Sequence, residues 1–176
     1  MRVSGGFYSR QAGLVLLISL VFLLLLSLVG LSSMRGAMSQ QKMAGSAWHR
    51  NQSFQSAESG LWVGESIVQR AGGTLPLCHS IITCAPPSES VSVVGAGTNP
   101  VSAVSWVAVS GGLYGVQSIG LGVGLARLPP LTPAALFRVT AVGFSGQSRT
   151  VLESVFARFD EGASPRFRRV LWRQLQ

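Results

Sequence analysis

Charged residues are scarce in this sequence, and acidic residues are the scarcest of them. Only 11% of the 176 residues are Asp, Glu, Lys or Arg, and just 6 are acidic, whereas soluble domains carry about 25% charged residues. The 14 Lys and Arg residues exceed the 6 acidic ones by 8, which gives a net charge of +8, but they are spread along the chain. A nucleic-acid groove needs them clustered in a stripe with aromatic residues. We therefore expect no nucleic-acid partner.

Residue types that commonly carry catalysis or bind metals are also few. The chain has 2 Cys and 2 His, so a structural zinc site, which needs about four ligands, would have to use His49 and His79 together with both cysteines. The nucleophile motif G-x-S-x-G is absent. The glycine-rich stretch 120–124 is not followed by the Lys-Ser/Thr of a phosphate-binding loop, so it indicates a loop or a weak strand. We predict a protein that is not an enzyme, with no catalytic residues, no cofactor and no metal.

What the sequence does have is one long uncharged apolar run, at residues 14–31. As a helix these residues would span about 27 Å, close to the hydrocarbon thickness of a bilayer. Arg2 and Arg10 precede the run and Arg35 follows it. The positive-inside rule then places the short leader in the cytoplasm and the rest of the chain in the periplasm or at the cell exterior. A cleaved secretory signal is the alternative, but its apolar region is usually shorter, and residues 30–32 match an A-x-A-like cleavage site poorly.

Helix-compatible sequence continues beyond the run, since residues 32–70 contain no proline. Apolar and small residues recur there at steps of three and four, which predicts one apolar stripe on an amphipathic helix. The stripe consists of Ala47, Phe54, Ala57, Leu61, Gly64 and Val68.

The residues around the apolar run resemble the amino-terminal region of PilX-type minor pilins of the type IV pilus. That family has a short basic leader that ends in Gly and a Leu/Val-rich helix that closes in a Gly-x-Ser-x-Met-Arg-like stretch. A Met-Ala-Gly step and an Ala-Phe-Gln-x-Ala-Glu-like segment follow. In this sequence the three features stand at residues 30–35, 43–45 and 53–58, and the resemblance covers about residues 10–65.

The resemblance implies that a prepilin peptidase cuts between Gly13 and Leu14 and that the new amino terminus on Leu14 is methylated. Major pilins carry an acidic residue at the fifth position of the mature chain, where this sequence has Ile18. PilX-type minor pilins and the tip pseudopilin of type II secretion also lack that acid. The departure therefore favours a capping or initiating subunit. Phe54 and Glu58 are the further positions that we assign to assembly.

The function implied is that of a minor pilin, which primes pilus assembly and sits in the tip complex, supporting motility and adhesion. Its partners would be other minor pilins, the major pilin, a tip adhesin, the prepilin peptidase and the lipid of the inner membrane. The subunit would be a single-pass inner-membrane protein with a periplasmic head, and it would reach the pilus tip after assembly. A type II secretion pseudopilin and a single-pass periplasmic interaction module remain as alternatives.

The remaining residues indicate a β-rich head. Dense glycine and proline punctuation from residue 71 onward predicts short strands joined by loops. Strands are expected at residues 90–94, 101–109, 135–142, 150–159 and 169–175, the last at a sheet edge. Segment 101–109 is either a buried strand or a contact surface with Trp106 as its anchor. Residues 135–142 and 150–159 alternate as a half-buried hairpin requires, with a flexible tip at 143–149.

These elements give an α+β fold in which a long helix packs on a small antiparallel sheet. The expected organisation is a leader at 1–13, a transmembrane segment at 14–34, a periplasmic amphipathic helix at 35–70 and a head at 71–176. Within the head, Cys78 and Cys84 enclose a short loop. In an oxidising compartment such a pair most simply forms a disulfide.

Overall fold

The structure is a computed structural model that describes residues 11–71, 74–125, 128–161 and 164–176. It divides into two units, Met1–Gly45 and Ser46–Gln176, and each is described by itself. The basic residues of the expected leader, Arg2 and Arg10, lie outside the described residues.

Helix α1 (Gln11–Ala71) begins in the first unit and ends in the second. Every side chain from residue 14 to residue 45 is exposed within the first unit. An 18-residue window of the helix has a mean hydropathy of 3.1, so by length and composition the helix could cross a membrane. Two serines in the apolar run, Ser19 and Ser27, donate their hydroxyls to backbone carbonyls one turn earlier, at 2.8 Å each. These local bonds satisfy the hydroxyls where no water would be available.

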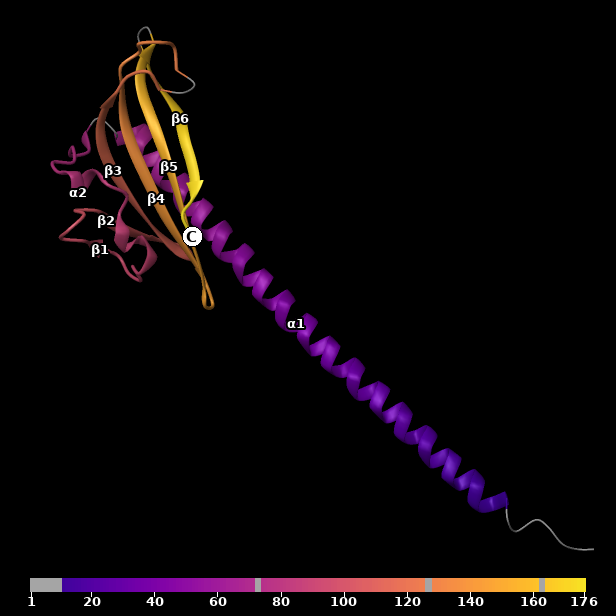
Figure 1. The fold of residues 1–176 in the computed structure, drawn as a ribbon. Helices are drawn as coiled ribbons and strands as arrows, with labels where there is room; N and C mark the ends of the chain where they lie inside the picture. Colours follow the sequence, from indigo (N-terminus) through magenta and orange to yellow (C-terminus); the bar gives the residue numbers. More distant parts are fainter. Residues whose placement is uncertain (1–10, 72–73, 126–127, 162–163) are drawn as a thin grey trace, which may run out of the picture. The chain divides into compact units, whose positions relative to one another are not determined.

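The second unit contains a six-stranded antiparallel sheet whose strands follow one another in chain order. Figure 1 shows β3, β4, β5 and β6 side by side, with β1 and β2 continuing the sheet. The strands are β1 (Gly97–Thr98), β2 (Ser105–Val109), β3 (Gly112–Gly122), β4 (Ala134–Ser145), β5 (Ser148–Glu161) and β6 (Ser164–Gln174). A long apolar helix packed on an antiparallel sheet confirms the predicted α+β class.

One face of the sheet packs against α1. Ala57, Leu61 and Val68 of the helix are buried in one cluster with apolar residues of β3, β4 and β5. A Cβ at Gly64 would overlap the side chain of Val139, so glycine lets the helix approach the strand closely. The predicted stripe is therefore the buried face of the helix from residue 54 onward. Ala47 is a correction, because it is exposed.

The opposite face of the sheet is covered as well, by the segment that runs from α1 to β2. Val104 and Trp106 pack there with Val142 and Val151 in a second cluster. Trp106 is 3% exposed, so it packs inside the chain and does not anchor an exposed contact surface. The prediction of a half-buried hairpin was wrong, because both faces of β4 and β5 are enclosed.

Two further expectations about the strands need correction. Residues 90–94 form no strand, because η2 (Ser88–Val91), a 3₁₀ turn, occupies this region. In the 101–109 segment only Ser105–Val109 is a strand. The glycine-rich stretch 120–124, by contrast, agrees with the expected loop or weak strand, because β3 continues to Gly122 in register with β4 and a bend follows.

The hairpin tip is shorter than its sequence indicates. Strand β4 runs to Ser145 and β5 begins at Ser148, so two residues rather than seven make the turn. Gly146 has φ +55°, a backbone conformation that glycine adopts without strain. The strand expected at 169–175 is confirmed as an edge strand, since β6 ends the sheet order.

Candidate functional site

The predicted processing junction lies near the start of α1. Gly13 and Leu14 follow the first helical residue, Gln11, by two and three positions. Leu14 is 65% exposed, and no atom lies within 4 Å of a Cβ built on Gly13. Ile18, which stands where major pilins have an acid, is also exposed, at 47%. The exposed surfaces of Leu14 and Ile18 are available to lipid or to other helices.

The two assembly positions farther along α1 differ in their surroundings. Phe54 is half-buried against the helix–sheet cluster, and its ring meets that of Trp172 edge-on at a centroid distance of 6.5 Å. Glu58 is exposed. The structure therefore joins Phe54 to the last strand and leaves Glu58 at the surface.

A carboxylate that sequence reasoning missed, Glu65, lies between α1 and the sheet. It is 4% exposed, and its Oε2 accepts a hydrogen bond from Arg169 of β6 at 2.6 Å. The Arg169 guanidinium also lies over the ring of Phe156, 5.6 Å from its centroid. This ion pair links the helix to the edge strand.

A second contact joins α1 to the β4–β5 turn. The Nδ1 atom of His49 lies 3.0 Å from the hydroxyl oxygen of Ser145. Ser145 is buried at the end of its strand. This side-chain contact therefore connects helix α1 to the β4–β5 turn.

The disulfide loop, which we define as residues 78–84, lies beside β3. Cys78 and Cys84 are at disulfide distance, with their Cα atoms 5.2 Å apart. Between them α2 (Ile81–Cys84) forms a single turn with a capping box made by Ser80 and Thr83. The backbone N–H of Cys78 donates to the carbonyl of Ser118 at 2.9 Å. The loop is thus closed on itself and attached to the sheet.

Side chains of β3 and β4 hold the carboxyl end of the same loop. Gln117 donates from Nε2 to the carbonyls of Thr83 and Ala85, at 2.7 and 3.2 Å. Arg138 donates from one guanidinium nitrogen to the carbonyl of Cys84 at 2.7 Å and to Gln117 Oε1 at 3.3 Å. Side chains of two strands therefore satisfy the carbonyls of Thr83, Cys84 and Ala85.

Glu153 of β5 completes this polar cluster. Its carboxylate is 0% exposed, lies 3.3 Å from Arg138 Nε and accepts a bond from Arg173 of β6 at 2.9 Å. Burial lowers the pKa of the Arg138 guanidinium, the carboxylate of Glu153 opposes that shift, and the charge of Arg173 adds to it. The cluster connects the disulfide loop to the edge strand across four strands. The sign of this cluster in the sequence is that polar residues, among them Arg138 and Glu153, alternate with apolar ones in segments 135–142 and 150–159.

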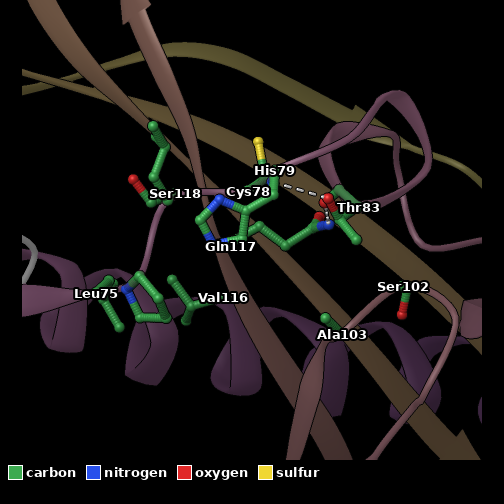
Figure 2. A pocket seen from close by; sticks show the side chains of 11 residues that line it. Leu75, Cys78, His79, Thr83, Ser102, Ala103, Val116, Gln117 and Ser118 are labelled. Carbon is green, nitrogen blue, oxygen red and sulfur yellow. Dashed lines mark hydrogen bonds between the residues drawn. The ribbon is translucent and has the colours of Figure 1, made fainter.

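A cleft of about 280 Å³ opens beside the disulfide loop. Figure 2 shows Leu75 and Val116 on one side of it, Ser102 and Ala103 on the other, and the imidazole of His79 between them. Its lining is mostly apolar and includes no carboxylate, lysine or arginine. Across residues 11–71, 74–125, 128–161 and 164–176, no group of three or more His, Cys, Asp and Glu could hold a metal ion.

The amino-terminal part of the chain matches a known family. Residues 12–61 match the family model described as PilX N-terminal. The match spans the apolar run and continues to Leu61 in the buried stripe, and it confirms the resemblance found in the sequence. No curated protein and no solved structure gives a match.

Proposed function

We propose that the chain is a minor pilin of the type IV pilus that primes assembly and sits in the tip complex, since its residues 12–61 match the PilX N-terminal family model. The observation that carries the proposal is the PilX N-terminal match at residues 12–61 on a helix whose apolar side chains are all exposed between residues 14 and 45. Such a helix stays in the bilayer until it packs against others. The role is structural, without enzymatic activity.

The proposed maturation begins at the junction between Gly13 and Leu14. A prepilin peptidase removes residues 1–13 on the cytoplasmic side of the inner membrane, and Leu14 becomes the methylated amino terminus. Removal of Arg2 and Arg10 lowers the side-chain charge from the +8 of the whole sequence by two. The periplasmic head, with Cys78 and Cys84 oxidised, then joins other minor pilins, the major pilin and a tip adhesin.

The tip position is supported by Ile18. A carboxylate buried among helices is costly unless it is paired, so a subunit inside the fibre gains from an acid only when a neighbouring amino terminus can meet it. A subunit that ends the stack lacks that neighbour on one side. An isoleucine there suits a cap that supports motility and adhesion without repeating along the fibre.

Substitution of Gly13 tests the proposal. No atom lies within 4 Å of a Cβ at Gly13 or at Gly36, so arginine fits either site without disturbing the described structure. Gly13→Arg should leave the leader attached and abolish incorporation into sheared pili. Gly36→Arg should still lose the leader. Equal chain masses for Gly13→Arg and the unmodified protein would contradict the proposal.

A further inference from the structure

Strand β6 lies at one edge of the sheet. It pairs with β5 on its inner side, and no other strand among the described residues pairs with its outer side. Figure 1 shows β6, in yellow, as the last strand of the sheet. From Ser164 to Gln174 every residue of β6 is exposed or half-buried. The outer side of the strand therefore presents backbone N–H and carbonyl groups to which a further strand can bind.

The register with β5 decides which side chains of β6 share a face. Arg169 binds Glu65 of α1, so it lies on the helix face of the sheet. Because side chains alternate along a strand, Phe167 lies on the helix face too, where it packs against the helix–sheet cluster. A register shift then adds one residue, and Trp172 returns to this face, where its ring meets that of Phe54. The helix face of β6 thus carries two aromatic side chains.

The opposite face of β6 carries a row of arginines. Arg166, Arg168 and Arg173 share this face, with Leu171 between the last two, and all four side chains are exposed. We call these four residues the arginine row. The row is continuous, because its members follow one another along one face of a single strand. From β4 to residue 176 the chain has seven arginines and three acidic residues, so the arginines outnumber the local acids even when Glu65 is added.

The arginine row indicates which strand fits the edge. Two copies of β6 paired edge to edge would bring one arginine row beside another, and like charges on neighbouring strands destabilise their pairing. Charged side chains on an edge strand thus prevent self-pairing. A strand with acidic side chains on the same face would instead form opposite-charge pairs with the row. A lipid headgroup could also meet the arginines, but it would leave the backbone groups of the edge without a ladder.

We propose that the outer edge of β6 binds an extended acidic segment of a partner protein, which joins the sheet as a seventh strand. Its acidic side chains lie beside the arginine row, and its alternate, apolar side chains lie beside Phe167 and Trp172. At the register shift, four consecutive residues, 169–172, line a hollow of about 370 Å³ that receives one side chain of the added strand. Main-chain bonds give such additions their affinity, and alternate side chains give them their specificity. The proposal goes beyond the minor-pilin function and does not depend on it.

Binding of a designed peptide to the full chain in phosphatidylcholine nanodiscs tests the proposal. The probe is a fluorescein-labelled peptide of alternating glutamate and valine, as long as the 11 residues of β6, and its anisotropy gives the dissociation constant. A peptide with lysine in place of glutamate should bind roughly tenfold more weakly or worse, because like charges then face each other. Amide exchange in β6 should slow when the glutamate peptide binds. Equal affinities of the two peptides, or unchanged exchange in β6, would overturn the proposal.

Two double variants distinguish the arginine row from net charge. Arg166→Gln with Arg168→Gln should weaken binding of the glutamate peptide about fivefold, as expected for the loss of two exposed ion pairs. Arg50→Gln with Arg70→Gln removes the same charge from exposed positions of α1 and should leave binding unchanged. Equal losses for the two double variants would overturn the proposal. All four substitutions replace exposed side chains, and an unchanged unfolding midpoint shows that the variants fold.

The backbone ladder and the lipid alternative have tests of their own. Methylation of every second backbone nitrogen blocks one edge of the peptide, and two complementary versions block either edge. At least one version should bind roughly tenfold more weakly, because an added strand depends on main-chain bonds; equal binding of both versions and the parent peptide would overturn the added strand. Slow exchange in β6 in phosphatidylglycerol nanodiscs without peptide would assign the arginine row to lipid and would also overturn it. An unmethylated Leu14 would contradict only the minor-pilin function.

Discussion

Loss of the buried carboxylate Glu153 should be the most damaging single change of charge in the head. Glu153→Gln preserves the shape of the side chain but removes its negative charge. Arg138, whose side chain is only 11% exposed, would then keep its positive charge without a counter-charge. Removing one partner from a buried ion pair costs about 3 to 5 kcal/mol of folding free energy. Arg173 adds little to this cost, because its side chain is 46% exposed and water can solvate it.

The same substitution at Glu65 is a matched control. Glu65 is also buried, but its partner Arg169 is 43% exposed and can turn to solvent. Glu65→Gln should therefore cost only about 1 kcal/mol or less, as expected for pairs that water can replace. The comparison depends mainly on whether an arginine left behind is buried, as Arg138 is and Arg169 is not.

Guanidinium unfolding of the full chain in detergent, followed by tryptophan fluorescence, measures both free energies. Equal losses for Glu153→Gln and Glu65→Gln would refute the reasoning, because burial of Arg138 would then carry no penalty. A double variant sharpens the test. Glu153→Leu with Arg138→Met removes both charges and should recover most of the loss from Glu153→Leu alone. Recovery should be incomplete, because Arg138 also binds the carbonyl of Cys84.

Three further predictions concern packing, the disulfide and one loop anchor. Gly64→Ala should lower the free energy of unfolding by about 1 to 3 kcal/mol in the same assay, since its Cβ has no room. Gly60→Ala is the control and should be tolerated, because the nearest atoms to its Cβ lie at 3.4 Å. Equal effects of the two variants would contradict the close helix–sheet packing. Reduction of the Cys78–Cys84 disulfide, or the double variant Cys78→Ser with Cys84→Ser, should lower the free energy of unfolding by about 2 kcal/mol, because the closed loop is short. An unchanged unfolding midpoint would show that the bond does not form. Arg149→Ala should speed amide exchange in η2 and its following residues, because that side chain donates to two backbone carbonyls there at 3.1 and 2.8 Å; unchanged exchange would disprove its anchoring role.

Helix α1 and the existence of strands β4 and β5 could be predicted because their side chains repeat with a clear period, although the burial of both faces of these strands could not. Ala57, Leu61 and Val68 recur at helical spacing, and Phe137 and Val139 alternate along a strand, so each set marks a buried face. Such patterns are local and need no knowledge of distant contacts. The candidate processing junction at Gly13 and Leu14 could also be proposed from the sequence, because its features lie within one continuous segment.

Strand β3 and the buried ion pairs could not be predicted in this way. Gly112–Gly122 contains several glycines, and it is a strand because β2 and β4 pair with it on both sides, not because of its own propensity. Glu65 and Glu153 looked like surface residues, because charge is rarely buried unless it is paired. Glu65 and its partner Arg169 are 104 residues apart in the chain, and Glu153 and Arg173 are 20 apart. Only the folded sheet brings each pair together.

The most direct test of the minor-pilin function is the intact mass of the chain, purified from pilus-forming cells and sequenced at its amino terminus by mass spectrometry. We expect a mature chain that begins with a methylated Leu14 and retains the whole apolar run of α1. A chain that begins at Met1, or one cut after the apolar run near residues 30–32 as a secretory signal would be, would contradict the proposal.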